Sequence, residues 1–333
     1  MKKKVLITGI SGMVGSHLAD FLFKNTNWEI YGLIRWRSSL INLSHNLKFL
    51  DKRLFFLYSD IRDANNINTI IRNHNFNYCF HLAAQSYPQV SFTSAADTYE
   101  TNILGTENLL SAFKEYSIKT IIHVCSSSEI FGRVKKENLP IDESCPFHPA
   151  SPYAISKIGT DQISKYYAEA YKMKILTTRM FTHTGPRRGD VFAESTFAKQ
   201  IARIEINLQK PTLLTGNLDS LRTWADVRDA VRAYYMLVTV NPKFGESYNI
   251  GGDYTCTVRD MLKTLLSFSK KKIKVITDVN RLRPIDADLQ VPNTKKFRSH
   301  TGWEPQIKFR KTMLDLLNYW RKEVKFRKDI INR

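Results

Sequence analysis

The chain has 333 residues, of which 43% are hydrophobic and 24% are charged. With only 14 glycines and 11 prolines, it is typical of a globular protein and not of a collagen-like or low-complexity chain. Its formal net charge of +19 is compatible with nucleic-acid binding or with an enzyme that acts on anionic substrates.

Apart from the C-terminal run RKEVKFRKDIINR, the basic residues are scattered along the chain. No nucleic-acid-binding motif is present, so we predict no nucleic-acid partner. No apolar run reaches the ~18 residues of a membrane-spanning helix, and the N-terminus lacks a signal-peptide pattern. The cysteines do not have the spacing of a metal site; they are Cys79, Cys125, Cys145 and Cys256. We predict a cytoplasmic protein with reduced cysteines, no membrane partner and no bound metal.

Short apolar runs alternate with amphipathic segments through the first half of the chain. They predict strands at residues 4–9, 29–34, 54–60, 78–84, 120–126 and 173–181, and helices that include residues 13–25 and 101–116. Apolar strands that alternate with helices predict a parallel sheet covered on both faces. The predicted fold class is α/β, with a doubly wound parallel-sheet Rossmann domain at residues 1–180. A smaller α/β domain occupies most of residues 181–333, and a segment near residues 222–248 is predicted to return to the first domain.

A glycine-rich turn follows the first predicted strand. Gly9, Gly12 and Gly15 are spaced three apart between this strand and a predicted helix, which is the context that a dinucleotide-binding turn requires. Glycine lets the main chain approach a pyrophosphate, whose charge the helix N-terminus stabilises. A plain strand-to-helix turn is the alternative, and this context disfavours it. We predict that the turn binds a dinucleotide through Thr8, Gly9, Ser11, Gly12, Met13, Val14 and Gly15.

The end of the second predicted strand indicates which dinucleotide binds. NAD-binding folds place an acid at this position, whereas this chain has Arg35, followed by Arg37 and Ser38. A guanidinium pairs with a 2′-phosphate, so the sequence favours NADP over NAD. The ends of the next two predicted strands complete the expected cofactor site: Asp60 and Ile61 near the adenine, and Leu82, Ala83 and Ala84 beside the pyrophosphate.

Tyr153 and Lys157 lie four residues apart in SPYAISK, on one face of a predicted helix. Exposed pairs of this kind are common on helices, but here a dinucleotide turn and a serine-rich strand end precede the pair. We predict that the Lys157 ammonium stabilises the Tyr153 phenolate and makes it a base near neutral pH.

These motifs together resemble the extended short-chain dehydrogenase/reductase family. The resemblance covers nearly the whole chain and rests on the glycine turn, Ser127 and Tyr153-x-x-x-Lys157. Further runs are most similar to GDP-mannose 4,6-dehydratases and GDP-manno-heptose 4,6-dehydratases: IRWRSS, HLAAQSYPQVSF, SSSEIFG, FHPASPYAISK, HTGPRRG, GNLDSLRTW and RPIDADL. The resemblance implies an NADP cofactor, a GDP-sugar substrate and a homodimer or homotetramer.

It also implies the catalytic roles. Ser127 would hydrogen-bond the sugar O4, and Tyr153, supported by Lys157, would remove the O4 proton as C4 is oxidised. Glu129 would then remove the C5 proton and help the 6-hydroxyl to leave. Ser128 stands beside Glu129 where dehydratases of TDP-glucose carry an aspartate, which favours the GDP-mannose branch.

The second half supplies the implied substrate pocket. Thr182 stands where the family usually has asparagine, and the stretch FAESTFAKQ lacks the Arg-Lys pair found near there. Arginine forks suit phosphate oxygens, and a carboxylate suits ribose hydroxyls. The expected substrate-binding residues are Ser86, Ser127, Ser128, Thr182, Arg187, Arg188, Arg222, Arg283 and Asp286.

Two alternatives remain open at this point. The same Ser127, Tyr153 and Lys157 serve GDP-sugar 4-dehydrogenases, 4-reductases and epimerases, which do not eliminate water. A regulatory Rossmann protein without chemistry is the other alternative, and the intact Ser127, Tyr153 and Lys157 argue against it.

Overall fold

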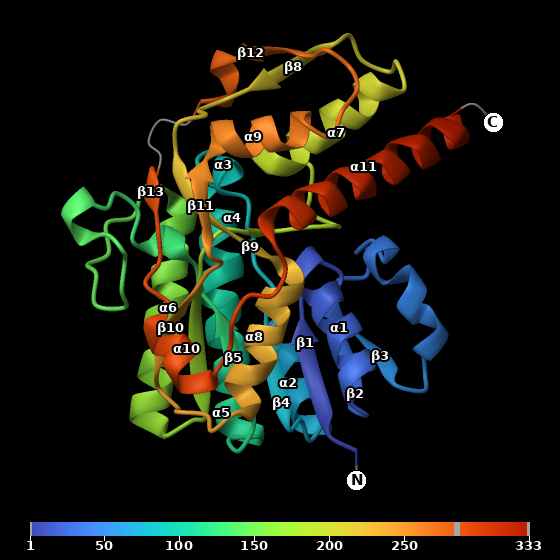
Figure 1. The fold of residues 1–333 in the computed structure, drawn as a ribbon. Helices are drawn as coiled ribbons and strands as arrows, with labels where there is room; N and C mark the ends of the chain where they lie inside the picture. The colour runs from blue at the N-terminus through green and yellow to red at the C-terminus, as the bar shows by residue number, and fades with distance from the viewer. Residues whose placement is uncertain (1, 283–286, 332–333) are drawn as a thin grey trace.

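The structure is a computed structural model that describes residues 2–282 and 287–331 (Figure 1). Its centre is a parallel sheet of seven strands in the order β10-β6-β5-β4-β1-β2-β3. The register places Leu6 between Tyr31 and Cys79 on the neighbouring strands. The strands are β1 (Lys4–Thr8), β2 (Glu29–Ile34), β3 (Leu54–Tyr58), β4 (Tyr78–His81), β5 (Ile121–Cys125), β6 (Ile175–Met180) and β10 (Ser247–Ile250).

Helices cover both faces of this sheet, which confirms the predicted fold class. On one face, Leu18 of α1 (Met13–Asn25) and Val231 of α8 (Val227–Thr239) pack in the same apolar cluster. On the other face, α2 (Ala64–Asn73), α5 (Gly105–Tyr116) and α6 (Pro152–Tyr171) bury their apolar side chains. The six predicted strands are all present, because each is an apolar run long enough to cross a buried sheet.

The helix predicted over residues 101–116 is interrupted. A π-helical segment, η2 (Glu100–Leu104), comes before α5, and the short helices α3 (Pro88–Ser91) and α4 (Ala95–Tyr99) precede it. The carbonyl oxygen of Asn102 in η2 accepts hydrogen bonds from the hydroxyls of Thr106 and Thr160, at 2.6 and 2.9 Å. Side chains from two helices therefore satisfy a carbonyl that a wider π turn makes available.

A smaller region lies above the carboxyl ends of the sheet strands (Figure 1). Its apolar core joins α7 (Ala193–Glu205), α9 (Val258–Leu266), α11 (Phe309–Ile331) and β8 (Thr212–Thr215). β12 (Lys274–Thr277) pairs with β8, while β9 (Leu221–Asp226) pairs with β7 (His183–Thr184), β11 (Tyr254–Thr257) and β13 (Leu289–Gln290). After β9 the chain leaves this region and forms α8 and β10, which complete the large sheet and its cover. It then returns to the smaller region with β11 and α9.

The remaining elements are short helices in the connections: η1 (Ile41–Phe49), η3 (Ser128–Ile130), η4 (Lys136–Asn138), η5 (Val279–Arg281) and α10 (Lys295–Thr301). Within the described ranges, no helix combines the length and the apolar character that crossing a bilayer requires.

Candidate active site

One cleft of about 890 Å³ lies at the carboxyl ends of the sheet strands, between the sheet and the smaller region. Parallel α/β sheets bind ligands at this edge. Every predicted site residue that the structure describes lines the cleft except Thr8 and Arg37. Arg283 and Asp286 lie outside the described residues. Residues from both halves of the sequence therefore meet in one place.

The glycine turn forms one wall of the cleft. Gly9 has a φ of +70°, and a Cβ on it would lie 2.8 Å from the main-chain nitrogen of Ala83. A Cβ on Gly15 would collide with the carbonyl oxygen of Gly9. Only glycine fits at both positions, and α1 begins directly behind the turn at Met13. A narrow main-chain cradle at a helix N-terminus suits a pyrophosphate, so these residues fit a dinucleotide.

Thr8 lies under this turn and not in the cleft. Its side chain is fully buried, and its hydroxyl oxygen accepts hydrogen bonds from the main-chain nitrogens of Leu82 and Ala83, both at 3.0 Å. Thr8 therefore supports residues 82 and 83 of the cleft lining from behind. We predicted that Thr8 would itself line the cofactor site.

The turn after β2 presents Arg35 at the cleft. Ser38 closes this turn: its main-chain nitrogen donates to Arg35 O at 2.8 Å, and its hydroxyl accepts from Arg35 N at 3.2 Å. Arg37 points elsewhere, because its guanidinium stacks on the Trp36 ring with 4.4 Å between guanidinium carbon and ring centre. The structure thus leaves Arg35 as the arginine of this turn that faces the cleft.

Asp60, at the end of β3, is engaged by a neighbour. Arg62 donates to both oxygens of its carboxylate, at 3.1 and 3.0 Å. These hydrogen bonds hold the pKa of Asp60 below its usual range, and the charge of Arg35 contributes in the same direction. Asp60 is therefore ionised and its charge is compensated by arginines on both sides.

The serine-rich stretch after β5 is a capped turn. Ser127 precedes the short helix η3, and its hydroxyl oxygen accepts from the main-chain nitrogen of Glu129 at 3.2 Å. Serine is a favoured residue at such a position. The cap turns the Glu129 side chain toward the cleft, where it is partly exposed. Among the residues that the structure describes, none forms a hydrogen bond or ion pair with the Glu129 carboxylate.

α6 brings Tyr153 and Lys157 to the same cleft. The helix starts with Pro152, and the Ser151 hydroxyl caps it by accepting from Ala154 N at 3.0 Å. Both functional side chains are buried, with exposed fractions of 8% for Tyr153 and 5% for Lys157. The Lys157 ammonium donates to the main-chain oxygen of Cys125 at 2.7 Å.

The predicted support of the Tyr153 phenolate by Lys157 stays a prediction. Burial raises the pKa of the Tyr153 phenol above its ordinary value, and a hydrogen bond to Ser127 only partly opposes the shift. Burial also lowers the pKa of Lys157. The groups of the chain itself therefore do not bring the phenol toward neutral pH, because desolvation of the phenolate outweighs the favourable contacts.

Arg188 projects into the cleft from the loop after β7. Its Nε donates to the buried carboxylate of Glu194 at 3.1 Å, and its guanidinium carbon lies 3.4 Å from the centre of the Phe192 ring. The charge of Arg188 is one of the contacts that favour the ionised form of Tyr153. This arginine is held in place by an acid and a ring, as a site for an anionic group requires.

Arg187 is held by α1, whereas Arg188 is held by α7. Arg187 pairs with Asp20 of α1 at 2.8 Å, and Asp20 also accepts from His45 and Asn46 of η1, each at 2.6 Å. The loop that carries Arg188 is therefore joined to the helix behind the glycine turn and to the segment after Arg35.

Comparison with known proteins identifies the family of the chain. A sequence model of the family described as GDP-mannose 4,6 dehydratase matches residues 6–316. The chain belongs to this family. It is 28% identical to GDP-6-deoxy-D-mannose reductase of Pseudomonas aeruginosa over 98% of this chain and 99% of the relative. It is 30% identical to GDP-mannose 4,6-dehydratase of Yersinia enterocolitica over 92% of this chain and 90% of the relative.

Solved structures show the same fold. The RMD structure from Pseudomonas aeruginosa, in complex with NADPH, matches with a TM-score of 0.83 and 26% identity, over 97% of this chain and 100% of that chain. UDP-glucose 4-epimerase of Thermotoga maritima with UDP-glucose matches with a TM-score of 0.84 and 25% identity, over 96% of this chain and 99% of that chain. The chain thus shares both the sequence family of the dehydratases and the fold of these solved enzymes.

Two predicted substrate residues of this family member lie at the edge of the smaller region. Arg222, on β9, donates a hydrogen bond to the carbonyl oxygen of Ala287. Thr182 accepts with its main-chain oxygen from Ala225 N at 2.9 Å, and this residue lines the cleft.

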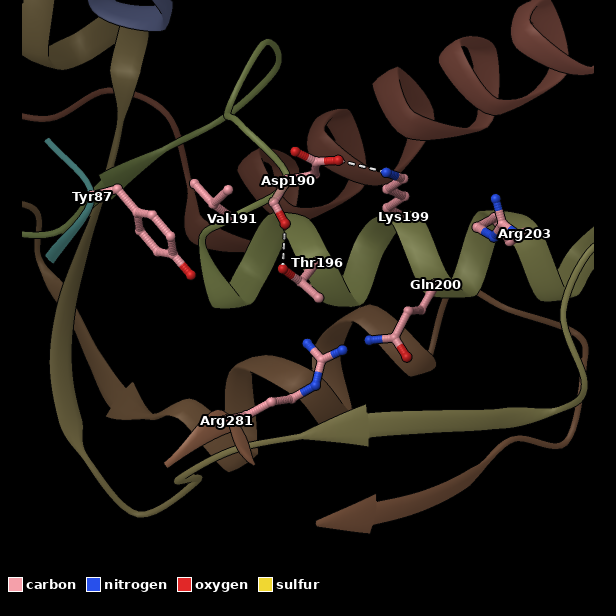
Figure 2. A pocket seen from close by; sticks show the side chains of 8 residues that line it. All are labelled: Tyr87, Asp190, Val191, Thr196, Lys199, Gln200, Arg203 and Arg281. Carbon is pink, nitrogen blue, oxygen red and sulfur yellow. Dashed lines mark hydrogen bonds and ion pairs between the residues drawn. The ribbon is translucent and has the colours of Figure 1, made fainter. Parts of the chain in front are cut away.

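A second pocket of about 400 Å³ adjoins the main cleft (Figure 2). Tyr87 and Arg281 line both cavities; in the view Tyr87 lies to the left of the helix that carries Gln200, and Arg281 lies below it. Lys199 on α7 pairs with Asp190 at 2.5 Å, and Gln200 projects from the same helix toward Arg281. The cleft thus continues into a polar chamber with more basic than acidic groups.

Sequence reasoning missed Asn102, a buried polar residue that lies behind the site. Gln85 lines the cleft, and its main-chain nitrogen and oxygen bond the side chain of Asn102 at 2.8 and 3.0 Å. Asn102 also donates to the Ser156 hydroxyl of α6 at 2.8 Å. An asparagine with an exposed fraction of 1% among apolar helical residues is the signal that could have revealed it.

Proposed function

We propose that the chain is an NADP-dependent 4,6-dehydratase that converts GDP-mannose or GDP-manno-heptose to the 4-keto-6-deoxy sugar. The observation that carries the proposal is that Ser127, Glu129 and Tyr153 face the cleft that the glycine turn also lines. A hydroxyl, a carboxylate and a phenol beside a dinucleotide cradle are what oxidation at C4 followed by elimination requires.

The choice of NADP rests on Arg35. It faces the cleft at the end of β2, where an acid would select NAD. A relative with 26% identity was solved with NADPH. When bound, NADP would accept a hydride from the sugar and return it, so that no cofactor is consumed.

The acid and base roles follow from the hydrogen bonds in the turn after β5. Because the Ser127 oxygen accepts from Glu129 N, its hydroxyl proton remains free to donate to the sugar O4 or to Tyr153. In its phenolate form, which the charge of Arg188 favours, Tyr153 takes the O4 proton during oxidation. Glu129, whose carboxylate has no partner among the described residues, takes the C5 proton once the 4-ketone makes that proton acidic.

The nucleotide part of the substrate would lie toward the smaller region. Arg188 and Arg222 line that side of the cleft and suit the diphosphate. Arg188 is desolvated and held by Glu194, so it loses little conformational freedom when it binds an anion. The chamber between Tyr87 and Arg281 offers room beyond the diphosphate for the rest of the nucleotide (Figure 2).

We also propose a homodimer or homotetramer. Leu104 and Ile155 are exposed by 47% and 46%, and they belong to the adjacent elements η2 and α6. Exposed aliphatic side chains on neighbouring helical segments are typical of a surface that another subunit covers. Light scattering gives the number of subunits directly.

The alternative is a GDP-sugar 4-dehydrogenase, 4-reductase or epimerase. It is supported by the 28% identity to GDP-6-deoxy-D-mannose reductase over 98% of the chain, because a reductase uses the same Ser127 and Tyr153 without elimination.

Product analysis decides between these functions. The purified protein is incubated with GDP-mannose, GDP-manno-heptose, GDP-6-deoxy-4-keto-mannose and UDP-sugar controls, and the products are identified by mass spectrometry. A dehydratase removes one water from a GDP-sugar with no net change in NADPH absorbance. Consumption of NADPH with the 4-keto sugar, and no loss of water from any GDP-sugar, would show a reductase instead.

A further inference from the structure

A buried histidine lies directly behind the turn of residues 82–85, which is part of the predicted cofactor site. His81 ends β4 with an exposed fraction of 3%, and it immediately precedes the turn of residues 82–85 that lines the cleft. Its Nδ1 lies 2.9 Å from the Thr8 hydroxyl, and its Nε2 lies 3.0 Å from the Thr106 hydroxyl. The mechanism above assigns it no role.

The neighbours of His81 determine where its proton is. The Thr8 oxygen already accepts from two main-chain nitrogens, Leu82 N and Ala83 N, so its only remaining bond is the one that its own proton donates. Thr8 therefore donates to Nδ1, and Nδ1 carries no proton. Thr106 donates its proton to Asn102 O at 2.6 Å, so it accepts from His81. His81 is thus the neutral imidazole with its proton on Nε2.

Burial supports the same conclusion. Desolvation, together with the charge of Lys157, lowers the pKa of His81 to about 3. The imidazole therefore stays neutral across the range in which the protein works, and the direction of both hydrogen bonds is constant.

The hydrogen bonds continue from Thr106 to the catalytic helix. Thr106 bonds the carbonyl of Asn102, whose side-chain amide bonds both main-chain polar groups of Gln85 at the far end of the turn. The same amide donates to Ser156, which in turn donates to the carbonyl oxygen of Tyr153 at 2.7 Å. Thr8 bonds one end of the turn and Asn102 bonds the other end. His81 connects them, because it bonds both Thr8 and Thr106, and Thr106 bonds Asn102.

We propose that His81 is a positioning residue, which in its Nε2-protonated neutral form fixes the turn of residues 82–85 relative to the helix that carries Tyr153. The role rests on the proposed function in one respect only: it takes this turn to be part of the cofactor site. Both hydrogen bonds of His81 face away from the cleft, so it acts through the turn and not on the reacting atoms.

Hydrogen exchange of the protein without cofactor or substrate tests the connection. Thr106→Val keeps the volume and removes the hydroxyl, so exchange of the Leu82, Ala83 and Gln85 amides should become about five- to tenfold faster, as expected for one lost hydrogen bond. Thr106→Ser keeps the hydroxyl and should restore wild-type exchange within about twofold. Because no chemistry is measured, this result is independent of the reaction that the protein catalyses.

A matched control lies on the adjacent strands. His123 of β5 is also fully buried, and its Nε2 bonds the Thr178 hydroxyl at 2.8 Å. Within the described part of the chain, neither side chain forms a hydrogen bond with the turn of residues 82–85. Thr178→Val should lower the melting temperature about as much as Thr106→Val and leave exchange in residues 82–85 unchanged. NADP affinity, measured by fluorescence titration, should fall about five- to tenfold in Thr106→Val and in His81→Asn, and should stay at the wild-type value in Thr178→Val.

Wild-type exchange and NADP affinity in Thr106→Val would overturn the proposal. So would equal changes in Thr106→Val and Thr178→Val, since the effect would then be a general loss of stability. If His81→Asn does not fold, the valine and serine variants of Thr106 still decide the question. If NADP affinity falls as expected but no sugar is dehydrated, the positioning role stands and the proposed function fails.

Discussion

The Lys157 ammonium donates a hydrogen bond of 2.7 Å to the main-chain oxygen of Cys125. This contact joins the helix that carries Tyr153 to the strand that delivers Ser127. In the mechanism that we propose, the phenol and the serine hydroxyl act on the same sugar oxygen, and the lysine holds together the two elements that carry them. The sequence predicted an electrostatic role alone, because spacing on a helix shows which residues share a face and not where a flexible ammonium ends.

Tyr153→Phe should remove the base for O4 without disturbing the fold, since the ring remains and only the hydroxyl is lost. We expect kcat to fall by about 10²–10⁴, the contribution of a positioned acid or base. Steady-state kinetics with the GDP-sugar substrate measure the change, and the unfolding midpoint should match that of the wild type. A variant within a few-fold of wild-type kcat would exclude Tyr153 as the base.

Glu129→Gln should separate elimination from oxidation. Glutamine has the size of glutamate but does not accept the C5 proton. Oxidation at C4 should still take place, so NADPH absorbance should appear and persist, while the 6-deoxy product and solvent deuterium at C5 should be missing. Mass spectrometry in deuterated water checks this. Dehydration by the variant at near wild-type rate would assign the proton to another base.

Arg35→Asp should change the cofactor preference. The exposed guanidinium at the end of β2 favours a 2′-phosphate, and an aspartate would repel it. NADP affinity should fall by about 2–4 kcal/mol, estimated from a lost charge-assisted contact and a new repulsion. NAD affinity should change far less. Arg37→Asp is the matched control, because Arg37 stacks on Trp36 and does not line the cleft. Equal losses for both cofactors in Arg35→Asp would refute the assignment.

The buried Arg179–Asp161 ion pair should contribute more to the free energy of unfolding than an exposed ion pair. Arg179 bonds both carboxylate oxygens at 2.9 Å, and the two side chains are exposed by only 8% and 0%. Asp161→Asn would leave a buried guanidinium without a counter-charge and should lower the free energy of unfolding by about 3–5 kcal/mol. Glu169→Gln removes the exposed partner of Lys165 and should cost less than about 1 kcal/mol. Urea unfolding of both variants measures the difference, and similar losses would contradict the prediction.

Stability should decrease in weak acid because buried histidines are neutral in the folded protein. Burial lowers the pKa of His81 and His123 to about 3, and of His17 to about 4. The unfolded chain takes up these protons near pH 6.5 and the folded chain does not. The contribution of these histidines to the free energy of unfolding is therefore fully present above pH 6.5 and is lost as the pH decreases toward 4. Each histidine contributes a slope of up to about 1.4 kcal/mol per pH unit.

Urea unfolding from pH 7.5 to 5 checks this slope. His123→Asn removes one of the groups and should flatten the curve, even though the variant is less stable at neutral pH. An unchanged slope would show that His123 is protonated in the folded state.

The sequence contained enough information for the large sheet and for most of the cleft. The six predicted strands are apolar runs, and the glycine turn has a spacing that its main-chain geometry requires. β10 was missed because SYNI is short and half polar: its Asn249 is fully buried and bonds Ile141 O, a contact that only the tertiary structure supplies. The interruption at Asn102 was missed for the same reason, since the hydroxyls that satisfy its carbonyl come from two different helices.

The sequence predicted residues that line the cleft where chemistry and position coincide, as at Ser127, Glu129 and Tyr153. The direction of an arginine could not be predicted. Arg187 and Arg188 are adjacent in the sequence, yet one pairs with Asp20 of α1 and the other with Glu194 of α7. Likewise, two neighbouring arginines after β2 differ, because Trp36 offers a ring on which Arg37 stacks.

The late position of β10 in the chain has a consequence for synthesis. After β6 ends at residue 180, the ribosome must add a further 70 residues before β10 is complete at residue 250, which takes about 3.5 to 14 s at ~5–20 residues per second. During this interval the outer edge of β6 is unpaired, and α8 has not yet covered the apolar face of α1. An open parallel edge can recruit strands from other chains. The nascent polypeptide is therefore most in need of chaperone protection while residues 181–250 are being translated.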